Sequence, residues 1–182
     1  MKLTHKMYNP NKKFLDTFGN RYYKGDYAGD CVVRAFTKLT DLDYMTVASM
    51  VATANNYSDI RMINNGNYID RLYSYYLKPR GYVRITFSHK GNLRNTAKLA
   101  VKGLLDYKVD GDYDNSFDPA VDGVSSLADR YVTWLVGGRY NAHMATTKNY
   151  TLYDSWDCSG SRVDGSAYVK TDGALADSFD WS

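Results

Sequence analysis

Residues 130–156 read RYVTWLVGGRYNAHMATTKNYTLYDSW, and this stretch decides the expected fold. It contains three segments rich in β-branched and aromatic residues, at 130–138, 140–147 and 150–156. A Gly-Gly turn follows the first segment, and a Lys-Asn dipeptide separates the second from the third. Short turns of this kind join adjacent antiparallel strands. We therefore expect consecutive hairpins and an antiparallel sheet in the last third of the chain.

The sequence upstream of the sheet has helical periodicity instead. In the octapeptide GDCVVRAF, which starts at residue 29, Asp30 can cap a helix that runs from Cys31 to about Leu39. A second apolar stripe at helical spacing covers residues 44–52, and Asp43 can cap it. Two helices are therefore expected before residue 55.

The middle of the chain continues this mainly helical part. Residues 68–77 predict a third helix, which Pro79 and Gly81 stop. Residues 82–87 alternate like a strand, and residues 93–107 return to a helical pattern.

A chain in which the helices come first and the sheet comes last has the order of elements of an α+β fold. We expect a single domain over residues 1–182, because this length and a hydrophobic fraction of 44% fit one ordered core. Within it we distinguish an extended N-terminal segment (1–28), a mainly helical part (30–107) and an antiparallel sheet part (131–170).

Charge, cysteine content and hydropathy argue against several classes of function. The 23 basic and 20 acidic residues give a net charge of +3 without a block of like charge, so no nucleic-acid partner is expected. Cys31 and Cys158 could form one bridge, but they provide neither a disulfide framework nor metal-type spacing. No signal peptide or membrane-length apolar run stands out, so we expect a cytoplasmic start and no membrane partner. The oligomeric state stays open.

An acidic loop raises the question of a calcium site. Asp110, Asp112 and Asp114 have the spacing that starts a calcium-binding loop. However, glycine stands at the second position rather than the sixth, and no glutamate closes the loop at position 12. We therefore expect neither a metal nor a cofactor.

Three residues have the order and setting of a thiol-dependent site. Cys31 opens a helix, where backbone N–H groups and the helix dipole favour a thiolate. His143 lies in one expected strand, and Asp154 ends the next strand of the same hairpin. An aspartate beside a histidine accepts its ring N–H and fixes the tautomer, so the other nitrogen can take the thiol proton.

Structural explanations compete with each of these roles. Cys31 could be a small buried hydrophobic residue, and His143 could be a structural strand histidine. Trp156 either packs in the core or shields the His–Asp pair from water. Asp157 ranks second to Asp154 as the partner of the histidine, because alternation places Asp154 and Trp156 on one side of the strand. Cys158 looks like a turn residue, and we assign it no chemistry.

The segments GDCVVRAF, DYMTV and NAHMATTKNYTLYDSWDC together resemble the papain-like cysteine peptidase superfamily. The DSW tripeptide is similar to the Asn-Ser-Trp of papain relatives. The Asp30-Cys31 pair resembles the bacteriocin-processing peptidase domains of export transporters, and small papain-like proteins of phages and bacteria look most similar. The resemblance implies N-terminal helices packed on a C-terminal antiparallel sheet. It also implies a Cys31–His143–Asp154 triad that cleaves a peptide or isopeptide bond through an acyl-enzyme.

One departure from that superfamily concerns the oxyanion. Papain relatives place a glutamine six residues before the cysteine, whereas this chain has Gly25 there and no glutamine at all. The backbone N–H of Cys31 would need a second donor, for which Asn20, Lys24 and Tyr27 are candidates.

The missing glutamine keeps a second class of function open. The same fold could be catalytically inactive and serve as a structural or binding protein, for example in a phage particle or against a host defence factor. A cell-wall amidase or peptidase with a similar dyad is a third class. The expected location is the cytoplasm of a bacterial host or a virion.

Overall fold

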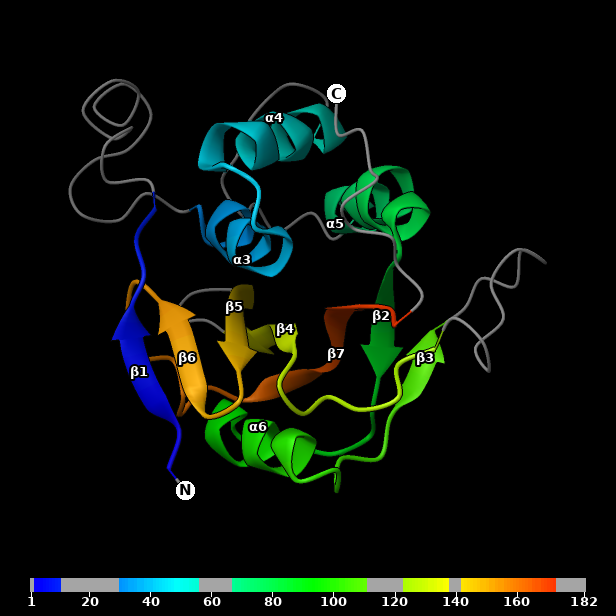
Figure 1. Cartoon of the computed structure of the whole chain (residues 1–182). Helices are drawn as coiled ribbons and strands as arrows, with labels where there is room; N and C mark the ends of the chain where they lie inside the picture. Colours follow the sequence, from blue (N-terminus) through cyan, green and yellow to red (C-terminus); the bar gives the residue numbers. More distant parts are fainter. Residues whose placement is uncertain (1, 11–29, 56–66, 111–122, 138–141, 173–182) are drawn as a thin grey trace.

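The computed structural model describes residues 2–10, 30–55, 67–110, 123–137 and 142–172. Within these residues the fold is α+β, with four α-helices and a seven-stranded mixed sheet (Figure 1). The strands lie side by side in the order β1-β6-β5-β4-β7-β2-β3. The α+β class expected from the sequence is confirmed.

The helices and strands have the following bounds. The strands are β1 (Thr4–Met7), β2 (Tyr82–Thr86), β3 (Lys108–Asp110), β4 (Tyr131–Gly137), β5 (Ala142–Lys148), β6 (Thr151–Asp154) and β7 (Val163–Lys170). The helices are α3 (Cys31–Thr40), α4 (Tyr44–Ala54), α5 (Asn67–Leu72) and α6 (Leu93–Val101). A π-helical turn (Tyr73–Leu77) and a 3₁₀ turn (Lys78–Arg80) continue α5. Over the described ranges, no helix is both long and apolar enough to cross a membrane.

Strands β4, β5 and β6 form the two antiparallel hairpins that the sequence predicts. Val136 pairs with His143 across the first hairpin, and Thr146 pairs with Tyr153 across the second. This register places His143 near the start of β5 and Asp154 at the end of the neighbouring β6.

The expectation of a purely C-terminal, antiparallel sheet is wrong. Strand β1 comes from the N-terminus and runs parallel to β6, and β2 and β3 come from the middle of the chain. Backbone bonds hold β1 in place, including Thr4 N–H to the Tyr150 carbonyl at 2.7 Å. Strands of four and three residues with little apolar alternation leave no periodic signal in the sequence. Of the expected extended segment 1–28, residue 1 and residues 11–28 lie outside the described part.

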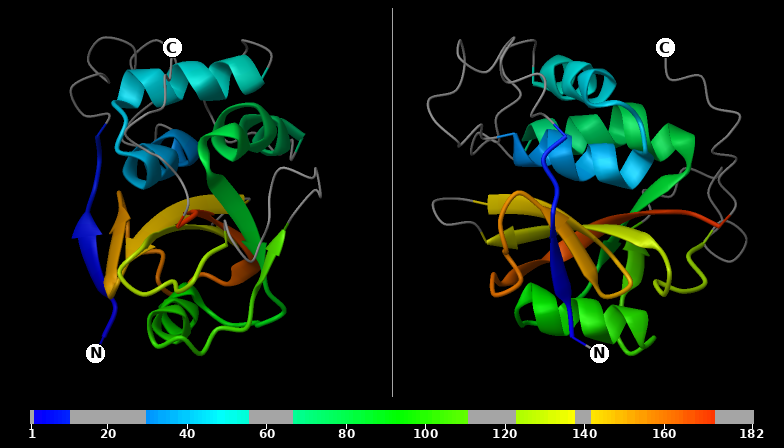
Figure 2. Two further views of the ribbon diagram at one scale, coloured as in Figure 1. Left: turned by 45° about the vertical axis from the view of Figure 1, so that its right-hand side comes forward. Right: turned by 60° about the vertical axis from the view of Figure 1, so that its left-hand side comes forward.

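Helices cover both faces of the sheet, as Figures 1 and 2 show, and a separate core cluster accompanies each set of helices. Helices α3, α4 and α5 cover one face, where their apolar side chains meet Met144 of β5 and Tyr168 of β7. On the other face, α6 contributes Leu93, which packs in a cluster with Trp134 of β4 and Ile85 of β2. One helix of the expected helical part thus lies opposite the other three.

The helix ends follow the sequence signals in most places. Asp43 caps α4 as expected, because its side chain accepts the Thr46 N–H at 3.1 Å. Helix α6 stops at Val101, earlier than the pattern over 93–107 suggested, and Gly103 follows with φ +70°. The expected capping of α3 by the Asp30 side chain is wrong. Asp30 stands at the N-cap position, but its carboxylate makes other bonds, described below.

Candidate active site

Three elements converge where β5 and β6 meet the start of α3. Helix α3 packs across β5 and also contacts β4 and β6. Cys31 is the first residue of α3, His143 lies in β5, and Asp154 ends β6. The fold therefore brings together the three residues that the sequence singled out, although 123 positions separate the first from the last.

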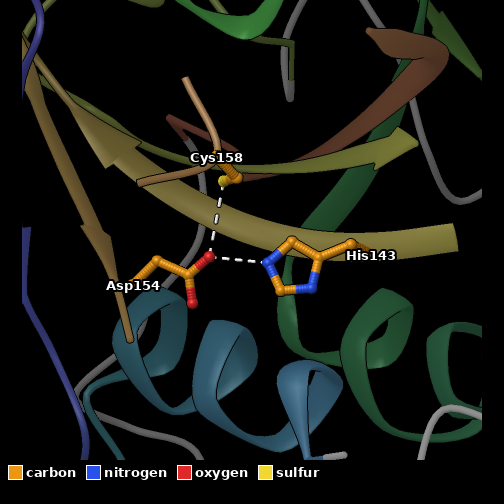
Figure 3. Close-up of side chains that lie close together, drawn as sticks. All are labelled: His143, Asp154 and Cys158. Atoms are coloured by element: carbon orange, nitrogen blue, oxygen red, sulfur yellow. Dashed lines mark hydrogen bonds and ion pairs between the residues drawn. The ribbon is translucent and has the colours of Figure 1, made fainter. Parts of the chain in front are cut away.

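His143 and Asp154 form a buried pair (Figure 3). His143 Nε2 lies 2.6 Å from Asp154 Oδ2, and the two residues are only 7% and 2% exposed. Burial alone would lower the pKa of His143, but hydrogen bonds with Asp154 and with both cysteine side chains outweigh it and raise that pKa to about 12. Burial raises the pKa of Asp154, yet its bond to His143 holds that pKa below the usual value. The pair is therefore an imidazolium beside a carboxylate.

Cys31 is the third member of the arrangement. Its side chain hydrogen-bonds His143 and is 6% exposed. Since Nε2 of the ring bonds Asp154, the nitrogen left for Cys31 is Nδ1, which lies on the α3 side in Figure 3. Each ring nitrogen thus has its own partner, which is the arrangement in which one side chain orients a base and another gives it a proton.

A buried ionic network holds the second oxygen of Asp154. Oδ1 accepts from Arg34 Nη2 at 3.3 Å and from the Ser155 N–H at 2.7 Å. The other Nη of Arg34 bonds Asp30, whose second oxygen accepts from the Tyr44 hydroxyl at 2.6 Å. Asp30, which was expected to support the site, is linked to Asp154 through Arg34 and is not a side-chain helix cap.

Sequence reasoning missed Arg34 and Tyr44. The Asp30–Arg34 spacing of four residues is an ion-pair signal on a helix. That signal was available, but helical periodicity does not reveal that an arginine within an apolar stripe is buried.

Cys158 lies at the site as well, a position that its interpretation as a turn residue did not anticipate. Its Sγ lies 3.4 Å from Asp154 Oδ2, and its side chain also hydrogen-bonds His143. It is 1% exposed, and burial raises the pKa of its thiol to about 11. The chain bends at Ser155 and Trp156, directly after β6, and Cys158 follows this bend. The sequence DSWDCSGS does not indicate that this bend brings the second thiol to the histidine.

The structure distinguishes the positions of the remaining candidate site residues. The Trp156 ring lies 5.0 Å from the His143 ring and is 38% exposed, so it covers the histidine rather than filling the core. Asp157 accepts from the Ser159 N–H at 3.0 Å instead of bonding the histidine, which favours Asp154 as the partner. Asn20, Lys24 and Tyr27, the candidate oxyanion donors, lie outside the described residues.

The acidic loop shows no sign of the calcium arrangement at the position that is described. Asp110 accepts from Arg84 Nε at 2.8 Å, and Asp112 and Asp114 lie outside the described part. Within that part, the side chains whose ligand atoms could converge on a metal ion are His143, Asp154 and Cys158.

Comparison with known proteins gives no relative: no family model matches the chain, and no curated protein or solved structure is significantly similar to it. What the site can do is therefore argued from its own geometry.

Proposed function

We propose that this protein is a cysteine-dependent hydrolase of the papain-like type, which cleaves a peptide or isopeptide bond. One observation carries the proposal: His143 is bonded to Asp154 through Nε2 and to the side chain of Cys31, which opens a helix. A buried structural histidine does not need a thiol and a carboxylate on its two nitrogens.

Each residue has a defined role in this chemistry. In the reactive state His143 is the imidazolium, its Nδ1 holds the proton given up by Cys31, and the Cys31 thiolate attacks the substrate carbonyl carbon. The imidazolium then donates this proton to the leaving amine, which leaves a neutral histidine and a thioester on Cys31. The neutral His143 deprotonates a water molecule that hydrolyses the thioester, which restores the thiolate and the imidazolium. Asp154 holds the ring orientation and stabilises the imidazolium throughout.

The surroundings support the thiolate and fix the aspartate. Backbone N–H groups at the start of α3 and the helix dipole favour a negative charge on Cys31. Arg34 and the Ser155 N–H hold Oδ1 of Asp154, so that Oδ2 faces the ring. The same backbone N–H groups supply one donor for the oxyanion, and the second donor is not among the residues identified.

The papain-like relationship is part of the proposal. It is supported by the chain order Cys31, His143, Asp154, by the cysteine at a helix start, and by the histidine and aspartate on paired strands. The edge strands β1 and β3 are additions to the expected sheet, and β1 pairs with the strand that ends in Asp154.

A second function, an inactive papain-like module that binds a partner or builds a particle, has its own supporting observation. Cys31 and His143 are 6% and 7% exposed, whereas a nucleophile must meet a carbonyl. The chain also lacks a glutamine that could stabilise the oxyanion, and this too favours an inactive module. A binding module would keep the triad only as a buried polar network.

A peptidyl probe with a thiol-reactive acyloxymethyl ketone separates the two functions. For a hydrolase we expect labelling of the wild type at Cys31, no labelling of Cys31→Ala, and full labelling of the matched variant Cys158→Ala. Peptide mass spectrometry identifies the labelled residue. A folded wild type that is inert at Cys31, or labelled at Cys158 alone, rejects the hydrolase and leaves the binding module.

A further inference from the structure

Cys158 has no task in the chemistry above, although it is buried against both members of the His–Asp pair. Its sulfur, one nitrogen of His143 and one carboxylate oxygen of Asp154 all lie within 4.8 Å of one another (Figure 3). A thiol, an imidazole and a carboxylate gathered at one point are the donor types of zinc sites with three protein ligands. We propose that His143 Nε2, Asp154 Oδ2 and Cys158 Sγ form a binding site for one zinc ion. This proposal concerns metal binding and does not depend on hydrolase activity.

Two of the distances between ligand atoms can be compared directly with those that tetrahedral zinc requires. With Zn–S near 2.3 Å and Zn–N and Zn–O near 2.0 Å, ligand atoms stand about 3.5 Å apart for the S–O pair and about 3.3 Å apart for the N–O pair. The Sγ–Oδ2 distance is 3.4 Å, which needs no change. The Nε2–Oδ2 distance is 2.6 Å, so this pair must open by roughly 0.7 Å as the ion replaces the proton between them.

The groups behind the three ligands are already in position. Asp154 keeps its contacts to Arg34 and to the Ser155 N–H on Oδ1 while Oδ2 binds the ion. His143 keeps Nδ1 for Cys31, which lies on the far side of the ring from Nε2 and is therefore not a ligand. Carboxylates and imidazoles that bind zinc in proteins are typically hydrogen-bonded in this way on the side away from the ion.

The charges balance when the ion binds. The Zn²⁺ ion, the Cys158 thiolate and the Asp154 carboxylate sum to zero, and Arg34 and Asp30 neutralise each other beside them. Binding displaces one proton from the Cys158 thiol and one from the Nε2–Oδ2 contact, and both pass to solvent. The fourth position of the tetrahedron takes a water molecule. Zinc is the ion that suits a mixed sulfur, nitrogen and oxygen set, whereas calcium and magnesium require oxygen alone.

Zinc binding and thiol catalysis exclude each other at this site. With the ion on Nε2, Asp154 no longer orients His143 and the ring cannot carry the imidazolium proton through a reaction. A protein that is a hydrolase is therefore inhibited by zinc, and one that is a binding module uses zinc as a structural element.

Cobalt(II) and zinc titrations of the full chain test the site directly, in metal-free buffer with a phosphine reductant. We expect one Co²⁺ per chain with a thiolate-to-cobalt charge-transfer absorption, and displacement of the cobalt by Zn²⁺. Cys158→Ser should remove this absorption and weaken zinc binding at least about 100-fold, more than the loss of an outer neighbour. The comparison variant Cys31→Ser should keep the absorption, because Cys31 is not a ligand, and should weaken zinc binding less than Cys158→Ser does.

A second measurement covers the case in which Cys158→Ser does not fold. In the wild type, saturating zinc should protect Cys158 from alkylation under mild denaturant, while EDTA restores its reactivity. The proposal is overturned if the wild type binds no cobalt with a thiolate absorption, if Cys31→Ser loses it as fully as Cys158→Ser, or if zinc leaves alkylation of Cys158 unchanged. The peptidyl probe does not enter these readouts, so failure of the zinc site and failure of the hydrolase are distinguished.

Discussion

At the scale of single residues, Asp154 is the centre of the molecule's chemistry. One oxygen faces an imidazole and a thiol, and the other is held by a guanidinium and a backbone N–H. Arg34 is the least expected of these partners, because it is a charged residue on the mainly apolar, buried face of α3. Its side chain is nevertheless buried, and the residue is only 6% exposed. Burial lowers the pKa of Arg34, but Asp30 and Asp154 outweigh it and raise that pKa, so the guanidinium is charged whenever the protein is folded.

Replacing Arg34 with methionine should destabilise the fold strongly. The change keeps the apolar stem but leaves Asp30 and Asp154 buried without their cation, a loss of about 3–5 kcal/mol for a broken buried pair. The stability of Arg34→Lys should lie between that of the wild type and that of Arg34→Met, since an ammonium cannot bond two carboxylates as a planar guanidinium does. Urea unfolding measures both variants, and a loss below about 1 kcal/mol for the methionine variant would show that the network is not what holds the site.

At the scale of elements, local signals explain the helices better than they explain the sheet. Asp43 illustrates a signal that works: its carboxylate accepts from both the hydroxyl and the N–H of Thr46. Asp41 ends α3 in a left-handed conformation, with φ 59° and its N–H on the Thr37 carbonyl. Both contacts lie within four residues of the chain, so residue type alone indicates where α3 ends and α4 begins.

Removing the cap of α4 should cost a predictable amount. Asp43→Ala leaves the first-turn N–H of Thr46 without its side-chain acceptor, and such changes cost about 1 kcal/mol of unfolding free energy. Asp164→Asn, an exposed change in β7, serves as the matched control for loss of a surface carboxylate. Urea unfolding at neutral pH should separate the two variants, and equal midpoints would contradict the capping role.

The same cap predicts a pH dependence. Hydrogen bonds from the Thr46 side chain and backbone lower the pKa of Asp43 below its usual value. A lowered folded pKa means that the stabilisation is complete above the unfolded value, near 4, and disappears as the pH falls through the folded value. The stability difference between wild type and Asp43→Asn should therefore be constant above about pH 5 and shrink below about pH 4. A difference that persists unchanged at pH 2 would show that charge is not its source.

The sequence predicted the elements whose contacts are local and missed those whose contacts are distant. The helices from Cys31 and after Asp43, and the β4–β5–β6 hairpins, follow from periodicity and short turns. Strand β7 was not singled out, since Gly165 with φ +68° interrupts its apolar alternation and a register shift interrupts its pairing with β4. Cys158 was missed for the related reason that a bend after β6, rather than a periodic pattern, places it beside Asp154. The contact between His143 and Asp154 was predictable because the two residues share one hairpin.

At the scale of the whole molecule, the N-terminal strand β1 supports the end of β6, which carries Asp154. Met7 pairs with Asp154, and the Tyr8 N–H donates to the Asp154 carbonyl at 2.9 Å. The His5 ring lies 2.9 Å from the same carbonyl oxygen. Along β1, the backbone N–H groups of successive residues point alternately towards β6 and towards the open edge of the sheet. The N–H groups of Thr4 and Tyr8 point towards β6, so the N–H group of Lys6 does too, whereas that of Met7 points towards the open edge.

Because of this alternation, proline substitutions in β1 test whether its hydrogen bonds to β6 support the end of β6. Lys6→Pro removes an N–H on the β6 side and should lower the unfolding free energy by at least about 1 kcal/mol, with faster hydrogen exchange at the end of β6. Met7→Pro removes an N–H on the open edge of β1, where proline is tolerated, and should have a smaller effect. Equal losses in the two variants would mean that β1 does not pair with β6 as described.

The proposed function requires the His143–Asp154 pair to activate Cys31, and site-resolved alkylation of the folded protein measures this activation. Iodoacetamide rates at Cys31 and Cys158 are followed by peptide mass spectrometry in the wild type and in His143→Ala. We predict that Cys31 reacts faster than Cys158 in the wild type and at least about 100-fold more slowly once the histidine is removed, as expected for loss of a general base. A Cys31 rate that is unchanged in His143→Ala, or that lies below the Cys158 rate in the wild type, would contradict the account.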